Sequence, residues 1–444
     1  MISQEPVIRV GIFEHYPEVQ GSLQGKFAVA NVIGLKGDFV VRSERGTIFF
    51  TNPSGQRILS GDEILCQPLE GGTFTLKGVK IGIDFHWERK EDQAFEGRLR
   101  LVAQDGRTVS AINEIGLESY LKSVISSEMS AQAPLEFLKA HAIIGRSWLV
   151  ALLERKKADE DGKARPHKKT LRDDEVIRVY GHENHGTFDV CADDHCQRYQ
   201  GVTKIINDAA SQAVEATRGI YLVYKDEVCD TRYSKSCGGL SENYENVWDD
   251  QEIPYLRSVS DSLTKYKPVK SERDAEKWIH STPDAYCAAT DPEFLRQILP
   301  SFDQETRDFF RWKVEYRREE LEELITKKSG IDFGTLRDLI PISRGPSGRI
   351  SKLKIVGSSK TVTVGKELEI RKWLSASHLY SSAFTVTTER DAEGLPQKFI
   401  LTGAGWGHGV GFCQIGGAVM ASKGFDAEAI VKHYFKGTEL AKLY

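Results

Sequence analysis

Residues 117–148 constrain the fold of this chain more than any other stretch of its sequence. Their first part carries apolar side chains at helical spacing, at Leu117, Leu121, Val124 and Ile125. The pattern breaks at 130–134, and Pro134 suits the first turn of a new helix, where a missing N–H costs little. The sequence therefore predicts two helices joined by a short break.

Glu128 ends the first predicted helix, about 20° from its apolar stripe at roughly 100° per residue. A carboxylate on an apolar face is costly unless it is paired, and exclusion of water raises its pKa. A general acid needs that property at neutral pH. The alternative is a helix-end glutamate that turns outward or meets a lysine, which is the commoner arrangement.

Composition sets the broad class of the protein. The chain has 444 residues, 40% hydrophobic and 28% charged, with a net charge of −4. These values indicate a soluble protein of two or three domains and give no reason to expect a nucleic-acid partner. No apolar run approaches the ~20 residues of a membrane span. Residues 1–13 lack the pattern of a signal peptide, which favours either a cytoplasmic protein or an export signal upstream of these residues.

A cluster of histidines and cysteines follows a charged insertion at 154–178. His182, His185, Cys191, His195 and Cys196 fall within fifteen residues. The C-x4-C spacing is within the range of thiolate zinc sites, and a nearby histidine can complete the ligand set. The alternatives are a Cys191–Cys196 disulfide or two free thiols. The seven cysteines of the chain do not decide the redox compartment.

Two further stretches suggest a sugar-binding site. In SKSCGGLSENYENVW (234–248), two glycines allow a sharp turn beside polar and aromatic residues, although a plain loop is the default interpretation. In LTGAGWGHGVGFCQIGG (401–417), alternating glycines display Trp406, His408 and Gln414. A phosphate loop is excluded because no GK[ST] follows. Trp406 could stack on a sugar and His408 could donate a hydrogen bond or exchange a proton; the alternative is a tight turn with a buried histidine.

Several stretches in a fixed order resemble the motifs of the SpoIID/LytB domain family. They are YLKSVISSEMSAQAPLEFLKAHAIIGRSW, SKSCGGLSENYENVW and GAGWGHGVGFCQIGGAVMASKGFDAEAIVKHYFKGT, and DVCADDHCQRYQG resembles the family's cysteine-bearing segment. The resemblance covers roughly residues 95–250 and 380–444. It implies an extracytoplasmic protein, periplasmic or associated with the cell wall, whose partners are peptidoglycan glycan strands and a cell-wall amidase.

The predicted fold class is α+β, with four parts. They are an N-terminal β region at 1–110, the first part of a SpoIID/LytB core at 111–259, an inserted α/β module at 260–375, and the second part of the core at 376–444. Strands are predicted at 7–13, 26–33, 38–41, 47–50, 73–83 and 98–102, between Gly, Asn and Asp turn residues. The Cys/His segment at 182–196 and the glycine-rich cleft loop belong to the core.

The resemblance implies that the protein is a lytic transglycosylase, or else an amidase enhancer that binds the wall and stimulates a hydrolase. In the first case Glu128, which matches the family's catalytic acid, protonates the leaving oxygen, and the sugar's own 6-hydroxyl closes a 1,6-anhydro ring. A zinc hydrolase is disfavoured because no H-E-x-x-H pattern is present. Ser130 departs from the family's usual proline.

The resemblance also bears on the remaining functional residues, some of which the sequence patterns had already indicated. It implies a structural zinc at His185, Cys191 and Cys196, and no organic cofactor. The candidates for binding the sugar are Tyr233, Glu242, Trp406, His408 and Gln414. Cys237 and Cys413 replace serines that are frequent in the family, which puts any hydroxyl role at these positions in doubt.

Overall fold

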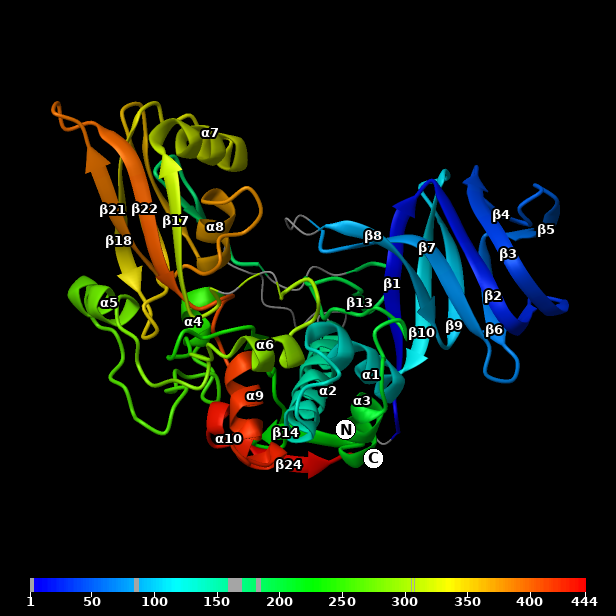
Figure 1. Ribbon diagram of the computed structural model, residues 1–444. Coiled ribbons are helices and arrows are strands. Elements are labelled where there is room, and N and C mark those ends of the chain that lie inside the picture. Colours follow the sequence, from blue (N-terminus) through cyan, green and yellow to red (C-terminus); the bar gives the residue numbers. More distant parts are fainter. Residues whose placement is uncertain (1–3, 84–87, 159–169, 181–184, 305, 307) are drawn as a thin grey trace. The chain divides into compact units, whose positions relative to one another are not determined.

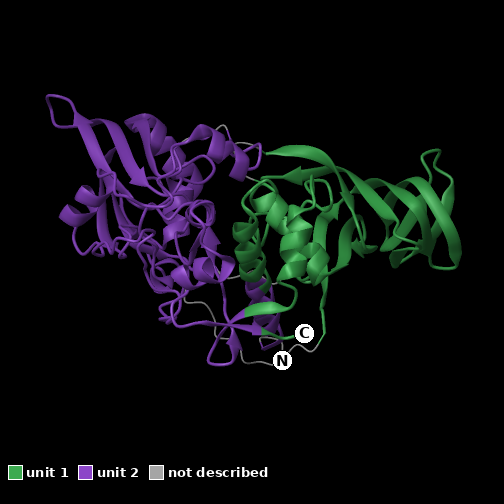
Figure 2. Ribbon diagram, turned by 60° about the horizontal axis from the view of Figure 1, so that its bottom comes forward, with its two compact units in different colours: residues 1–146, 182–221, 442–444 green, residues 147–181, 222–441 purple. Residues whose placement is uncertain are grey.

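A computed structural model describes residues 4–83, 88–158, 170–180, 185–304, 306 and 308–444. The chain divides into two compact units, coloured in Figure 2. Unit 1 comprises residues 1–146, 182–221 and 442–444, and unit 2 comprises residues 147–181 and 222–441. His182 lies outside the described residues.

Unit 1 is built on one sheet that contains all the strands before the first helix (Figure 1). Its main path runs β13-β1-β10-β9-β6-β2-β3-β4-β5, and β7 pairs with β2 and β8. The strands are β1 (Val7–Tyr16), β2 (Glu18–Val29), β3 (Val32–Glu44), β4 (Thr47–Thr51), β5 (Arg57–Gly61), β6 (Glu63–Pro68), β7 (Thr73–Ile81), β8 (Arg89–Phe95), β9 (Arg98–Gln104), β10 (Thr108–Gly116) and β13 (Val190–Cys191). The described residues before α1 are therefore mostly β, and the bounds of the predicted N-terminal region stay a prediction.

Several strands of this sheet alternate in burial, as a half-covered sheet requires. In β7, Phe74 and Leu76 are buried while Thr73 and Lys77 are not. The register with β8 then shifts between Leu76 and Val79, across a glycine of positive φ, so that Val79 and Ile81 are buried again. This irregularity is a β-bulge that keeps the apolar face of β7 turned inward.

The helices of unit 1 are α1 (Leu117–Glu128), the first half of α2 (Leu135–Ala158) and α3 (Ala209–Ala216). The predicted helices and the break between them are confirmed. All four apolar residues of the predicted stripe of α1 are fully buried. A side chain at Gly145 of α2 would contact Leu121 and Gln197, so this glycine allows α1 and the 197 segment to approach α2 closely.

Unit 2 contains several small sheets and most of the helices. Its five-stranded sheet has the order β11 (Thr170–Leu171), β12 (Glu175–Ile177), β20 (Thr361–Gly365), β19 (Ile350–Gly357) and β18 (Leu336–Arg344). The other strands are β14 (Ile220–Tyr224), β15 (Glu227–Val228), β16 (Tyr233–Ser234), β17 (Arg311–Arg317), β21 (Phe384–Arg390), β22 (Pro396–Ala404), β23 (Phe412–Cys413) and β24 (Glu439–Lys442). The chain crosses between the units four times: within α2, between residues 181 and 182, within β14 and within β24.

The helices of unit 2 are α4 (Tyr244–Val247), α5 (Glu272–Ile279), α6 (Pro292–Ile298), α7 (Arg318–Ser329), α8 (Glu367–Trp373), α9 (Gln414–Ser422) and α10 (Ala427–Tyr434). Side chains accept hydrogen bonds from the first turns of α5, α6 and α10, which begin after Ser271, Asp291 and Asp426. One hydrophobic core joins α7 and α8 to the sheets, with Trp312, Leu321 and Trp373 among its members. Together the units confirm the α+β class. No helix in the described part of the chain is long and apolar enough to cross a membrane.

Candidate active site and metal centre

Glu128 is the last residue of α1 and is buried in unit 1, with 8% of its surface exposed. Its Oε1 accepts a hydrogen bond from the backbone N–H of Arg198 at 3.0 Å. The alternative in which this side chain turns outward is therefore wrong. A buried carboxylate held by a backbone N–H keeps a defined position, which proton transfer to a bound substrate requires.

Asp194 and Arg198 lie beside this carboxylate, and the sequence analysis did not single them out. Arg198 donates from Nε to Asp194 Oδ1 at 2.8 Å. Burial raises the pKa of Asp194 to about 7; Arg198 opposes this shift and the Glu128 charge adds to it. In the sequence, both residues are marked only by their place in the cysteine-bearing segment.

The segment Gln197–Gln200 fastens the cysteine-bearing loop to the two helices. Gln197 accepts a hydrogen bond from Tyr120 Oη at 3.2 Å and donates one to the Gly145 carbonyl at 3.3 Å. The Gln200 N–H donates to Ser123 Oγ at 3.1 Å, and the Tyr199 ring stacks on Tyr120 at 5.1 Å. The loop that carries the cysteines is thereby fixed to the helix that carries Glu128.

The predicted metal ligands come together in unit 1. The donor atoms of His185, Cys191, His195 and Cys196 all lie within 4.8 Å of one another. His185 Nε2 is 3.3 Å from Cys196 Sγ, and His195 Nδ1 is 3.5 Å from the same sulfur. Neither cysteine is in a disulfide, so that alternative is wrong. The sequence left the fourth donor open, and the structure supplies His195.

This Cys/His cluster can bind a metal ion. Contact with Cys196 holds the pKa of the Cys191 thiol well below its usual range; burial opposes the shift, and both histidines add to it. Two thiolates and two imidazoles are a donor set that soft divalent ions such as zinc accept in tetrahedral sites. Four protein donors leave no position for a substrate, which is typical of a structural site.

The five predicted sugar-binding residues belong to unit 2, on two segments that pair with each other. β16 and β23 run parallel, with Tyr233 opposite Phe412. The Trp406 N–H donates to the Ser236 carbonyl at 2.7 Å, and the Glu242 N–H donates to the Gly409 carbonyl at 2.8 Å. The structure therefore brings Tyr233, Glu242, Trp406, His408 and Gln414 onto one paired element, whereas Glu128 belongs to unit 1.

The glycine-rich loop is shaped around a buried arginine that the sequence analysis missed. Arg349 donates from Nε and Nη2 to the Gly407 carbonyl at 3.1 and 3.0 Å, and from Nη1 to the Cys237 carbonyl at 3.1 Å. A Cβ at Gly409 would lie 2.3 Å from the Arg349 guanidinium carbon. The glycine at 409 therefore accommodates the protein's own side chain, and no local sequence pattern connects it with a residue so distant along the chain.

Two of the five residues have internal partners that fix the loop. Glu242 is fully buried, and its carboxylate accepts hydrogen bonds from Ser347 Oγ at 2.5 Å, the Asn243 N–H at 2.8 Å and Asn246 Nδ2 at 2.9 Å. His408 Nδ1 accepts from the Val410 N–H at 3.0 Å. Roles for both residues toward a sugar remain predictions, and these contacts show how each orders the backbone around it.

Trp406 and Gln414 differ in exposure. The Trp406 ring is partly exposed and stacks on Tyr380 at 4.3 Å, with Phe309 on a tilted contact at 4.8 Å. Gln414 is 2% exposed at the start of α9. Of these two, only the aromatic platform around Trp406 offers a surface on which a sugar ring could stack.

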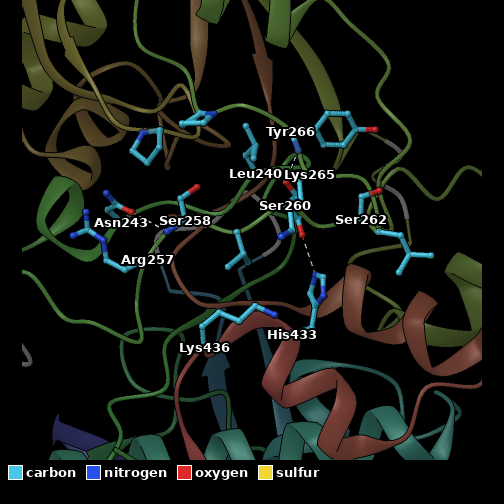
Figure 3. A pocket seen from close by; sticks show the side chains of 14 residues that line it. Leu240, Asn243, Arg257, Ser258, Ser260, Ser262, Lys265, Tyr266, His433 and Lys436 are labelled. Atoms are coloured by element: carbon cyan, nitrogen blue, oxygen red, sulfur yellow. Dashed lines mark hydrogen bonds between the residues drawn. The ribbon is translucent and has the colours of Figure 1, made fainter.

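A separate cavity of about 610 Å³ lies elsewhere in unit 2 (Figure 3). Its wall carries three cationic side chains, Arg257, Lys265 and Lys436, together with several serine hydroxyls. His433 Nε2 donates to the Ser260 carbonyl at 2.9 Å across this wall, as the dashed line in Figure 3 shows. Within the described residues, the lining includes none of the site residues predicted from the sequence.

We expect the protein to lose stability in mild acid because of two buried histidines. Burial lowers the pKa of His408 to about 3, and the nearby charges of Arg232, Arg349 and Arg371 add to this shift. Burial also lowers the pKa of His433 to about 4; Lys436 adds to the shift, and the hydrogen bond to Ser260 opposes it. Above pH 6.5, the approximate pKa of a histidine in the unfolded chain, both histidines are neutral in the folded and in the unfolded protein, and neither costs any stability. Below it only the unfolded chain binds protons, so stability falls as the pH drops toward 4.

We expect each histidine to cost at most about 2 kcal/mol of unfolding free energy between pH 6.5 and 5. Urea unfolding at pH 7 and pH 5 measures this loss, and His408→Gln with His433→Gln should make the difference smaller. An unchanged difference in the double variant would show that other groups cause the acid sensitivity.

Two protein families match parts of this chain. The Stage II sporulation protein family matches residues 105–224, which include Glu128 and the Cys/His cluster. A second family, described as a domain of unknown function (DUF8618), matches residues 242–411.

Three relatives align with most of this chain. Stage II sporulation protein D of Bacillus subtilis is 26% identical over 337 residues, which cover 75% of this chain and 76% of that protein. An uncharacterised protein of Brachyspira hyodysenteriae is 27% identical over 333 residues, 75% of this chain and 68% of its own. The amidase enhancer of Bacillus subtilis is 23% identical over 340 residues, 72% of this chain and 40% of its own.

The paired helices and the cysteine-bearing loop fastened to them thus form a Stage II sporulation protein domain. These matches support a SpoIID/LytB family protein, in agreement with the resemblance of its sequence motifs.

Proposed function

We propose that this protein acts on the bacterial cell wall as a lytic transglycosylase that cleaves peptidoglycan glycan strands. The observation that carries the proposal is the buried carboxylate of Glu128 at the end of α1, held by the backbone of Arg198 inside the family-matched region. A general acid needs a carboxyl group in a site from which water is largely excluded, and the burial of this side chain provides one. We also propose that the protein works outside the cytoplasm, where its substrate lies.

The reaction needs one carboxyl group. Glu128 donates its proton to the glycosidic oxygen while the bond from that oxygen to the anomeric carbon breaks. The resulting carboxylate takes the proton of the sugar's own 6-hydroxyl, whose oxygen bonds to the anomeric carbon. The products are a 1,6-anhydro end and a new hydroxyl end, and no water is consumed. A hydrolytic glycosidase would instead need a second carboxylate to attack or to activate water.

The paired segments of unit 2 supply the proposed glycan contacts. Trp406 offers a stacking face and Tyr233 offers a hydroxyl group, whereas Gln414 is buried and its role toward the glycan stays a prediction. Glu242 and His408 accept hydrogen bonds from backbone N–H groups and so order the loops that carry these contacts. We retain the division of the chain into a core at 111–259 and 376–444 with an insertion at 260–375 as part of this proposal.

A second candidate function is that of a non-catalytic amidase enhancer, which the likeness to the Bacillus subtilis amidase enhancer favours. In that case the same elements would bind the wall or an amidase, and Glu128 would have a structural role. The two candidates share a location and a ligand but differ in product.

Mass spectrometry of peptide-stripped glycan after incubation with the protein separates them. A lytic transglycosylase gives fragments with 1,6-anhydro ends, each one water lighter than the hydrolysis product. If no such ends form while the protein stimulates an added amidase, the enhancer function is correct and the catalytic proposal is wrong.

We further propose that His185, Cys191, His195 and Cys196 hold a structural zinc ion. The ion would cross-link the loop that supplies the Arg198 N–H to Glu128, so its effect on activity would be indirect. Soft thiolate donors and the closed four-donor set support zinc over magnesium or calcium.

Replacing Cys191 and Cys196 by serine should remove one zinc ion per chain and lower the melting temperature, because metal binding contributes directly to folding. Elemental analysis and calorimetry measure the two effects. Cys66→Ser is the matched control: it removes another buried thiol of unit 1, in β6, that lies outside the cluster. An unchanged metal content in the double variant would refute the site.

A further inference from the structure

A second group of side chains that could bind a metal lies in unit 2, and none of its members belongs to the Cys/His cluster of unit 1. It consists of Cys237, Asp261, Cys287 and Cys413. Cys237 lies in the turn after β16, and Cys413 is the residue before the first turn of α9. Asp261 and Cys287 come from two loops, one on each side of α5. Residues far apart in the sequence thus converge on one point.

The spacing of these groups matches a tetrahedral metal site. Their four donor atoms all lie within 4.8 Å of one another. The Sγ atoms of Cys237 and Cys287 are 3.8 Å apart. Two thiolates at the usual zinc–sulfur distance of about 2.3 Å subtend an edge of about 3.8 Å in a regular tetrahedron. None of the three cysteines forms a disulfide.

Burial separates this group from water, so its ionised form needs a cation. The four residues are between 0 and 2% exposed. Charged thiolates or carboxylates removed from water require a compensating charge. The hydrogen bonds to the Asp261 carboxylate, as far as the described residues go, come from the Tyr434 hydroxyl at 2.6 Å and the Cys287 N–H at 2.7 Å, and no salt bridge neutralises it.

The surroundings hold the donors in place as a metal site requires. The Tyr434 hydroxyl and the Cys287 N–H orient the carboxylate, as outer partners orient metal ligands. The Cys237 N–H donates to Cys413 Sγ at 3.2 Å, which stabilises a thiolate there. A Cβ at Gly416 would lie 2.2 Å from Asp261 Oδ1, so this glycine lets the carboxylate lie directly against α9.

We propose that Cys237, Asp261, Cys287 and Cys413 form a second, structural metal site that binds a zinc-class divalent cation. Three sulfurs and one carboxylate oxygen close the coordination sphere, so the ion does not contact substrate. It joins the turn after β16, two long loops and the start of α9. Asp261 directly follows Ser260, which lines the cavity shown in Figure 3, so a bound ion would also stabilise the wall of that cavity. The inference does not depend on the catalytic proposal.

The test is metal content in a background that lacks the first cluster. The chain with Cys191→Ser and Cys196→Ser, purified and supplied with zinc, should retain one zinc ion per chain. Adding Cys287→Ser should abolish that zinc. Adding Cys229→Ser instead should not, because Cys229 is another buried thiol of unit 2, outside the cluster. A background chain that holds no zinc overturns the proposal.

A second measurement avoids any dependence on how the variants fold. Wild-type protein should bind two zinc ions, and its cobalt-substituted form should show thiolate-to-cobalt charge-transfer absorption from five cysteines rather than two. Alkylation of the unfolded, chelated chain followed by peptide mapping should find Cys237, Cys287 and Cys413 all reduced. One zinc ion per wild-type chain, absorption from two cysteines, or a disulfide joining Cys237 to Cys287 would each refute the site.

Discussion

Glu128→Gln should reduce the formation of 1,6-anhydro ends by roughly 10²-fold or more, the usual scale for the loss of a general acid. Glutamine keeps the shape of the side chain and an oxygen that can accept the Arg198 N–H hydrogen bond. It lacks the transferable proton. We therefore expect the fold and glycan binding to survive, and the loss to appear in kcat rather than KM.

Glu136→Gln provides the matched control. Glu136 lies in the first turn of α2 and pairs with Lys139 at 2.7 Å near the surface, so its replacement should change turnover little. Product analysis by mass spectrometry and binding to insoluble peptidoglycan are measured on both variants. Full cleavage activity in Glu128→Gln would show that another group is the acid.

Arg146→Met should destabilise the protein by about 3–5 kcal/mol, the cost of leaving a buried charge without its partner. Arg146 and Glu118 are 0% and 2% exposed. The guanidinium donates to both carboxylate oxygens, from Nη2 at 2.6 Å and from Nε at 3.0 Å. Methionine fills a similar volume, but among the described residues it leaves the Glu118 carboxylate with the Tyr444 hydroxyl and the Gly219 N–H as its donors.

Chemical denaturation of the variant measures this cost. Arg155→Met is the control from the same helix: its partner Asp230 keeps a second cation, Arg232, at 2.8 Å, and Arg155 is 40% exposed. Its loss should cost under about 1 kcal/mol. The double variant Glu118→Gln, Arg146→Met should recover part of the stability, and a single variant as stable as wild type would contradict the argument.

The same ion pair has a defined acid response. Burial alone would raise the pKa of Glu118, but Arg146, Tyr444 and the Gly219 N–H outweigh it and the pKa is lowered. A lowered folded value means that the stabilisation is complete above about pH 4.5 and is lost only as the pH falls further. This loss therefore begins at lower pH than the loss caused by His408 and His433.

Much of the architecture could be predicted because local pattern and tertiary structure agree. The apolar stripe and Pro134 predicted the two central helices, and strand-like runs between turn residues predicted most of the first strands. β18 escaped prediction: it contains Pro341, which argues against a strand, but β18 is the edge strand of its sheet, where a missing N–H is tolerated. α9 escaped because its glycines disfavour a helix, although Gly416 is needed for the approach of Asp261.

The site could be predicted only where its members are close in sequence. Cys191, Cys196 and His185 fall in one segment, so their spacing indicated a metal site. Asp194 stood in the same segment, but its proximity to Glu128 depends on how that loop packs on α1. Arg349 and the four-residue group around Cys287 come from distant segments. No local pattern connects them, because only the folded chain makes them neighbours.

Residues 442–444 belong to unit 1, and this has a consequence for synthesis on the ribosome. The Tyr444 hydroxyl donates to Glu118, and a side chain at Gly219 would collide with the Tyr444 backbone. About 220 residues of unit 2 are translated between Tyr221 and the return of the chain to unit 1. At 5–20 residues per second, unit 1 waits roughly 10–40 s for its last segment. Synthesis of unit 2 thus starts after that of unit 1, but all of unit 2 has been synthesised before residues 442–444 of unit 1.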